Sequence, residues 1–178
     1  MELELVRPVI SISPINMSLK LKHARDFAIL AHGDQKLSDG QPYSVHLDLV
    51  VNWLAHFKYF NVDDHQDVFI AAYLHDVVED TKVTLDEIEA RFGYRVRMLV
   101  WRLTDEPGAN RKEKKLNTYP KIVGIAEAIK LADRITNVTY SNNPKYRGMY
   151  KMEQAEFETH CRKGYPDMWN FLNKQLVH

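Results

Sequence analysis

An apolar run that begins at Ala71 ends in four ionisable residues, His75-Asp76 and, one turn later, Glu79-Asp80. Residues three and four apart share a face of a helix, so an uninterrupted helix would place one imidazole and three carboxylates within about one turn. Three carboxylates this close repel one another, and buried charges usually pair or coordinate a metal. A divalent cation would balance them, with His75 and Asp76 as ligands and with Glu79 and Asp80 spaced for acid–base work.

The same pattern has a simpler interpretation, an acidic helix end without a function. Such an end opposes the helix dipole and costs a few tenths of a kcal/mol to about one. Two residues elsewhere favour the metal site. His46 lies in the first turn of a predicted helix, where a histidine is often a surface or capping residue. Asp133 lies in an apolar helix predicted over residues 126–138, where a carboxylate needs a partner, ordinarily a salt bridge.

Together, the candidate ligands lie on three predicted helices and are His46, His75, Asp76 and Asp133. They offer two imidazole nitrogens and two carboxylate oxygens. This mixture suits Mn²⁺, Fe²⁺ or Zn²⁺ better than Ca²⁺, which prefers oxygen ligands only. The sequence therefore predicts a transition-metal site that joins distant parts of the chain.

The length and the charge bound the classes of protein to consider. The chain has 178 residues, 45% of them hydrophobic, and its 24 basic and 24 acidic residues give a formal net charge of zero. One domain of ordinary size fits this length. A neutral chain with no bilayer-length apolar stretch predicts neither nucleic-acid binding nor membrane association. With Cys161 as the one cysteine and no signal-peptide pattern, we expect the cytoplasm.

Helical periodicity predicts a single all-α domain, a compact bundle over residues 18–178, preceded by a short extended arm over residues 1–17. Ser18 is predicted to cap a helix that runs to about Lys36, and Ser44 is predicted to cap the next helix. Neither an internal repeat nor a second-domain boundary is evident. The fold is expected to bring the candidate ligands together in the bundle.

The sequence resembles the hydrolase domain of the RelA/SpoT family within the HD phosphohydrolase superfamily, and most of all its small stand-alone, Mesh1-type members. The resemblance covers roughly residues 19–172. It is carried by four blocks, Pro42-Tyr43-Ser44-Val45-His46, His75-Asp76-Val77-Val78-Glu79-Asp80-Thr81, Thr84-Leu85-Asp86-Glu87-Ile88-Glu89-Ala90-Arg91-Phe92-Gly93 and Lys130-Leu131-Ala132-Asp133-Arg134-Ile135-Thr136-Asn137.

The resemblance implies an HD-type helical fold. It also implies an enzyme that hydrolyses the 3′-pyrophosphate of ppGpp and pppGpp, giving GDP or GTP plus pyrophosphate. It implies a Mn²⁺ ion on the four candidate ligands, and Glu79 and Asp80 as the pair that positions and activates the attacking water. It further implies substrate contacts, on this chain at Lys36, Tyr43, Arg111, Asn137 and Arg147.

Family members carry an Arg-Lys pair where this chain has Leu37 and Ser38, and Lys36 comes one residue early. The preferred base is therefore left open. The alternatives are hydrolysis of another nucleotide (ppApp, NADPH or a nucleoside monophosphate) or a non-catalytic HD domain that binds a nucleotide or a partner. Fe²⁺, Zn²⁺ or Co²⁺ in place of Mn²⁺, and a homo-oligomer, also stay open.

Overall fold

The computed structural model describes residues 18–140 and 144–177, so the predicted arm at residues 1–17 lies outside the described residues. In these two ranges the regular structure is helical, which confirms the predicted all-α class. The helices are α1 (Leu19–His32), α2 (Ser44–Phe57), α3 (Gln66–Leu74), α4 (Val77–Asp80), α5 (Leu85–Phe92), α6 (Tyr94–Leu103), α7 (Arg111–Thr118), the 3₁₀ turn η1 (Tyr119–Lys121), α8 (Ile125–Tyr140), α9 (Pro144–Cys161) and α10 (Pro166–Val177).

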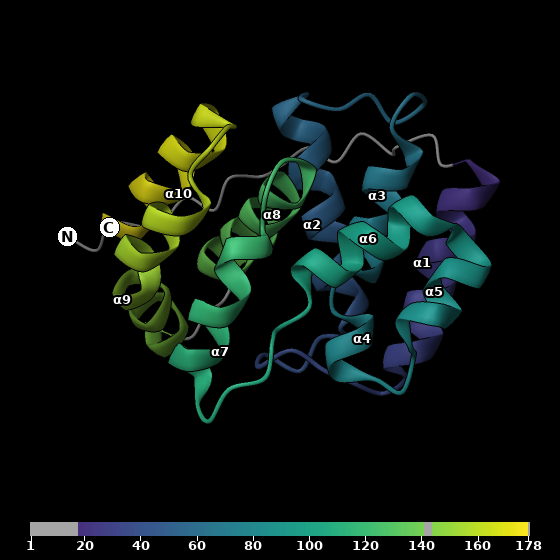
Figure 1. Ribbon diagram of the computed structural model, residues 1–178, viewed down its shortest axis with the longest axis horizontal. Coiled ribbons are helices and arrows are strands. Elements are labelled where there is room, and N and C mark those ends of the chain that lie inside the picture. The colour runs from purple at the N-terminus through teal and green to yellow at the C-terminus, as the bar shows by residue number, and fades with distance from the viewer. Residues whose placement is uncertain (1–17, 141–143, 178) are drawn as a thin grey trace.

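Helix α8 is the centre of the bundle. It lies between α2 on one side and α9 and α10 on the other (Figure 1) and packs against all three. Its residues are buried almost all round, from Ala126 to Thr136, because neighbouring helices cover every face. Helices α1, α3, α5 and α6 form the opposite half of the molecule, with α3 packed against α1, α2 and α6. This arrangement brings α2, α3 and α8 into mutual contact, and the candidate ligands lie on α2, directly after α3 and on α8.

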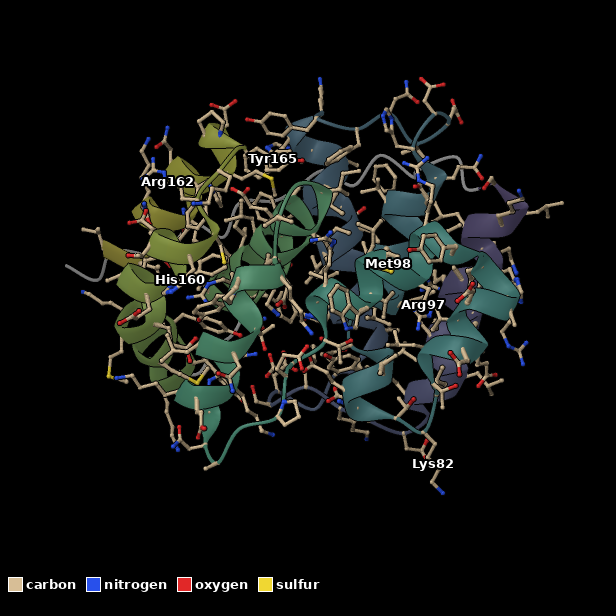
Figure 2. All side chains as sticks on the ribbon, in the orientation of Figure 1. Lys82, Arg97, Met98, His160, Arg162 and Tyr165 are labelled. Atoms are coloured by element: carbon tan, nitrogen blue, oxygen red, sulfur yellow. The ribbon has the colours of Figure 1, made fainter. Side chains whose placement is uncertain are left out.

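Side chains fill the space between the helices, and charged side chains such as those of Lys82 and Arg162 lie at the surface (Figure 2). The buried set forms one core, which extends from Leu21 on α1 to Leu176 on α10. None of the helices within the described ranges is long and apolar enough to cross a membrane.

Two helix ends differ from their predicted positions. Ser18 caps α1 as predicted, its hydroxyl accepting a hydrogen bond from the Leu21 amide, but α1 ends at His32 and not near Lys36. The cause is Gly33, which has φ 55°, a left-handed value that glycine adopts at little cost. Ser44 is the first residue of α2 rather than its cap. Tyr43 precedes it, with no side-chain capping bond.

The turn between α9 and α10 is fixed by a buried carboxylate of α8. Glu127 is 1% exposed, and its Oε1 accepts hydrogen bonds from the Lys163 and Gly164 amides at 3.1 and 3.0 Å and from the Trp169 indole at 2.7 Å. Tyr165 lies beside the same turn (Figure 2). Three donors on one carboxylate oxygen make Glu127 the polar anchor of the C-terminal helices.

Replacing Glu127 with alanine should leave the buried Trp169 indole and two partly buried backbone amides without this acceptor. We expect the free energy of unfolding to fall by about 2–4 kcal/mol. Urea unfolding followed by circular dichroism measures the change. The exposed Glu156 on α9 supplies the control, because Glu156→Ala removes a carboxylate that is 51% exposed. Equal stability losses in the two variants would contradict the anchoring role.

Candidate metal and catalytic site

The helix predicted to carry His75 and Asp76 is interrupted at these two residues. Helix α3 ends at Leu74 and α4 begins at Val77, so His75 and Asp76 form a turn between them, in contrast to the predicted uninterrupted helix. Consecutive residues of a regular helix point about 100° apart. At Asp76 the backbone departs from the helix, with φ −101° and ψ −6°. The departure accompanies a close approach of His75 Nε2 and Asp76 Oδ2, which lie 2.9 Å apart.

The four predicted ligands meet in the core. His46 Nε2 lies 3.3 Å from His75 Nε2, and Asp133 Oδ1 lies 3.4 Å from the first nitrogen and 3.8 Å from the second. Asp76 Oδ2 is 3.7 Å from His46 Nε2. Donors that bind one ion at about 2.0–2.2 Å lie roughly 3 Å apart when their bonds are near right angles. The spacing of His46, His75 and Asp76 therefore fits a shared cation, and Asp133 Oδ1 lies beside the two imidazole nitrogens as a further candidate donor.

The tautomer of His75 also favours a cation. Its Nδ1 lies 2.8 Å from the Ala72 carbonyl oxygen, which accepts only if Nδ1 carries the proton. In the neutral ring, Nε2 then presents a lone pair to His46 Nε2 and to the Asp76 carboxylate. Lone pairs facing one another repel unless a positive charge lies between them. A divalent ion would supply that charge.

The electrostatics of the cluster show that positive charge is needed beside its carboxylates. Burial works to lower the pKa of His75, but the Asp76 and Asp133 carboxylates outweigh it and raise that pKa to about 10. Burial would raise the pKa of both carboxyls, yet nearby positive groups, His75 for Asp76 and Lys130 for Asp133, lower each pKa below its usual value. Both carboxylates thus stay charged, balanced without a metal by a proton on His75 and by the Lys130 ammonium. A divalent ion that bound here would replace the His75 proton, because an imidazole binds a metal only in its neutral form.

Tyr43 holds one of the proposed ligands. Its hydroxyl donates a short hydrogen bond to Asp76 Oδ2, and its ring packs against His46 with centroids 5.2 Å apart. Partial burial and the neighbouring Asp76 raise the pKa of Tyr43 far above its ordinary value, so the hydroxyl keeps its proton and remains a donor. The structure thus places Tyr43, predicted as a substrate contact, against a proposed ligand.

Tyr43→Phe removes this hydrogen bond and keeps the ring. We expect Mn²⁺ affinity to fall roughly 10-fold, within the range typical for losing an outer-shell partner. Isothermal titration of the metal-free protein with Mn²⁺ measures it, with Tyr94→Phe on the exposed start of α6 as the control. Equal affinities in wild type and Tyr43→Phe would rule out the supporting role.

Glu79 and Asp80 are held by different parts of the chain. Glu79 Oε1 accepts a hydrogen bond of 2.6 Å from the Asp105 amide in the loop between α6 and α7. Asp80 Oδ2 accepts one of 2.9 Å from Gln35 Nε2 in the loop after α1. Glu79 keeps contact with solvent but is partly dehydrated, and this raises its pKa. A carboxylate with a raised pKa that still meets water is suited to accept a proton.

A cavity of about 230 Å³ opens beside the cluster. It is lined by Tyr43, His46 and Asn137, together with Lys36 from the loop after α1. Asn137 donates to Asp133 Oδ1 at 2.6 Å, so it connects the cavity to a proposed ligand. The structure therefore brings Lys36, Tyr43 and Asn137 to the same cavity as the ligand cluster.

The two arginines predicted to contact substrate are not part of this lining. Arg111, the first residue of α7, pairs with Glu153 of α9 at 2.7 Å and lines a second cavity of about 540 Å³ between these helices. Arg147 is half-buried, and its guanidinium donates to the Val138 carbonyl oxygen at 3.5 Å. Their substrate contacts therefore stay a prediction.

Lys130 is a functional candidate that the sequence interpretation did not single out. Its ammonium is 2.8 Å from Asp133 Oδ2. Burial alone would lower the pKa of Lys130, but Asp133, Glu79 and Asp76 raise it well above the usual value. The only sequence signal was a lysine three residues before Asp133, which is also typical of an ordinary helix salt bridge.

Comparison with known proteins identifies the family to which this chain belongs. The family model described as HD domain matches residues 24–161, so the chain belongs to the HD-domain family. Within it, the chain is 38% identical over 167 residues to human guanosine-3′,5′-bis(diphosphate) 3′-pyrophosphohydrolase MESH1, covering 89% of this chain and 92% of that protein. The predicted resemblance to stand-alone RelA/SpoT-type hydrolases is thereby confirmed.

Two further comparisons define the extent of the similarity. The Aquifex aeolicus guanosine-3′,5′-bis(diphosphate) 3′-pyrophosphohydrolase is 37% identical over 126 residues, and the match covers 67% of this chain but only 17% of that longer protein. A solved structure of a metazoan ortholog of SpoT superposes with a TM-score of 0.77 at 24% identity, covering 92% of this chain and 97% of that one. The superposition confirms the HD-type helical fold.

Proposed function

We propose that this protein is a metal-dependent phosphohydrolase that removes the 3′-pyrophosphate of (p)ppGpp-like nucleotides, giving the nucleoside 5′-diphosphate or 5′-triphosphate and pyrophosphate. The observation that carries the proposal is the convergence of two imidazoles and two carboxylates from α2, the α3–α4 turn and α8 beside a cavity. The reaction named for the human and Aquifex aeolicus relatives supports the choice of bond.

We propose Mn²⁺ as the ion, held by His46, His75, Asp76 and Asp133, because two nitrogen and two oxygen donors suit it. When bound, such an ion would place positive charge beside the phosphate oxygens and acidify water. Lys130 fixes Asp133 through Oδ2 and leaves Oδ1 facing the imidazoles. The chain thus orients its own donors before any ion arrives, and we expect a single site per protein molecule.

Proton transfer is assigned to Glu79. Its Oε1 is held by the Asp105 amide, so Oε2 is the oxygen that accepts the proton of the attacking water. Asp80, fixed through Gln35, borders the same region and helps to orient that water. Attack of this water at the 3′-phosphorus breaks the bond to the ribose 3′-oxygen, which leaves as the 3′-hydroxyl of the nucleotide product. The pyrophosphate group that is transferred to water carries several negative charges, which Lys130 and Arg111 would stabilise once substrate displaces Glu153 from Arg111.

The cavity lining bears on which base is bound. Leu37 and Ser38, which stand where the family has Arg-Lys, line the cavity with Tyr140 and Tyr146. Aromatic rings stack on any purine, and Leu37 offers neither donors nor charge for reading guanine edges. We therefore propose that adenine and guanine alarmones are both accepted, with hydrolysis of ppApp as the second candidate activity.

The test is turnover across a nucleotide panel. Purified protein is loaded with Mn²⁺ and incubated with ppGpp, pppGpp, ppApp and NADPH, and the products are separated by anion-exchange chromatography. We expect pyrophosphate from all three alarmones and none from NADPH; turnover of the guanine alarmones alone would reject the proposed acceptance of adenine. Intact alarmones alongside orthophosphate release from NADPH would reject the proposal in favour of a phosphatase, and binding without any turnover would reject catalysis.

A further inference from the structure

We propose that Lys115 and Asp105 are positioning residues that hold Glu79 where it can accept a proton. The inference rests on the role proposed for Glu79 and assigns a structural basis to it. The residues belong to three segments, α4 for Glu79, the α6–α7 loop for Asp105 and α7 for Lys115. None of the four predicted ligands takes part in these contacts.

The contacts form a continuous chain of hydrogen bonds. Lys115 Nζ donates to both oxygens of Asp105, at 2.7 Å to Oδ1 and 2.8 Å to Oδ2. The amide of Asp105 in turn donates to Glu79 Oε1 at 2.6 Å. The side chain of Asp105 therefore fixes the loop on α7, and its backbone fixes the carboxylate of Glu79.

Burial distinguishes this pair from a surface salt bridge. The side chain of Lys115 is 10% exposed and that of Asp105 is 18% exposed. Exposed ion pairs commonly contribute little, whereas a largely dehydrated pair loses heavily when one partner is removed. The loop is also tied to α7 at the next residue, where the Glu106 amide donates to Thr118 Oγ1 at 2.8 Å. The backbone that carries the Asp105 amide is thus held at two consecutive residues.

Lys115 is assigned a positioning role because both oxygens of Asp105 already engage its ammonium. Its neighbours on α7 differ in this respect. Arg111 pairs with Glu153 across the second cavity, and Lys114 is exposed to solvent. The one lysine of α7 that is buried is also the one joined to the loop that touches Glu79. An error of about 1 Å in the position of a catalytic group can cost roughly 100-fold in rate.

The test compares Lys115→Met, Lys115→Arg and the control Lys114→Met. Hydrogen exchange of the Asp105 amide, measured by NMR without metal or substrate, reports the bond to Glu79 directly. In Lys115→Met we expect protection of this amide to fall by about 10-fold or more, with little change in Lys114→Met. Arginine can bind a carboxylate through two N–H groups, so Lys115→Arg should restore much of the protection.

Kinetics of the Mn²⁺-loaded enzyme give the second readout. Lys115→Met should lower kcat by roughly 10- to 100-fold with KM nearly unchanged, because the base is displaced while substrate binding is kept. A raised KM with unchanged kcat would instead make Lys115 a substrate contact and overturn the positioning role. Unchanged Asp105 protection would overturn it as well.

Asp105→Asn provides an independent variant if Lys115→Met does not fold. It keeps the backbone N–H and the side-chain volume but removes the ion pair, so it should reproduce both effects. The two hypotheses fail separately. A wild-type protein that hydrolyses no nucleotide rejects the proposed function, whereas wild-type-like Asp105 protection in Lys115→Met and Asp105→Asn rejects the positioning role, whether or not the enzyme is active.

Discussion

His75→Ala is expected to abolish Mn²⁺ binding and alarmone hydrolysis together. His75 lies 1% exposed at the centre of the cluster, within 3.3 Å of His46 Nε2 and 2.9 Å of Asp76 Oδ2. Removing the imidazole takes away a proposed ligand and the ring that lies beside both the Asp76 and the Asp133 carboxylates. The loss of affinity should exceed the roughly 10–100-fold that removal of an outer-shell partner costs.

Calorimetric titration with Mn²⁺ and turnover of ppGpp are the two measurements for this variant. His23→Ala is the matched control, since His23 is an exposed histidine of α1 whose ring contacts Phe92 at a tilted angle. It should retain Mn²⁺ affinity and activity. Full activity in His75→Ala would overturn the ligand assignment, and lost activity with unchanged Mn²⁺ affinity would move His75 from metal binding to another role.

Glu79→Gln is expected to separate metal binding from catalysis. The amide keeps the side-chain size, and its carbonyl oxygen can still accept from the Asp105 amide. It cannot accept a proton as a carboxylate does, so kcat should fall by about 10²–10⁴-fold while Mn²⁺ affinity stays near that of the wild type. Single-turnover kinetics, with enzyme in saturating excess over ppGpp, measure the chemical step directly.

Glu89→Gln on α5 serves as the control for this substitution, because Glu89 pairs with Arg97 away from the cluster. It should leave kcat unchanged. If Glu79→Gln retains the wild-type rate, another group accepts the proton and the role assigned to Glu79 is wrong. If Mn²⁺ affinity falls as much as kcat does, Glu79 belongs to the metal site.

Periodicity was sufficient to predict the helices that carry the site. The helix predicted over residues 126–138 is α8, because its apolar spacing reflects burial on several sides. The turn at His75 and Asp76 was not predicted, since no glycine or proline marks it in the sequence. Its cause is tertiary, and hydrophobic spacing carries no signal for it.

The site was predictable where residue type alone limits the chemistry. A histidine beside aspartate, and an aspartate in an apolar helix, call for a partner wherever they lie. The pairing of Arg111 with Glu153 spans 42 residues and follows no spacing rule. Likewise, the bonds that join Lys115, Asp105 and Glu79 depend on how the α6–α7 loop folds back, which only the packed structure reveals.

The most direct test of the proposed reaction is one labelling experiment. The Mn²⁺-loaded protein hydrolyses ppGpp in ¹⁸O-labelled water, and the products are analysed by ³¹P NMR. Water attack at the 3′-phosphorus places the label in pyrophosphate, so we predict GDP and ¹⁸O-labelled pyrophosphate in equal amounts, and no reaction after the metal is removed. Unreacted ppGpp, release of orthophosphate, or pyrophosphate without the label would contradict the account.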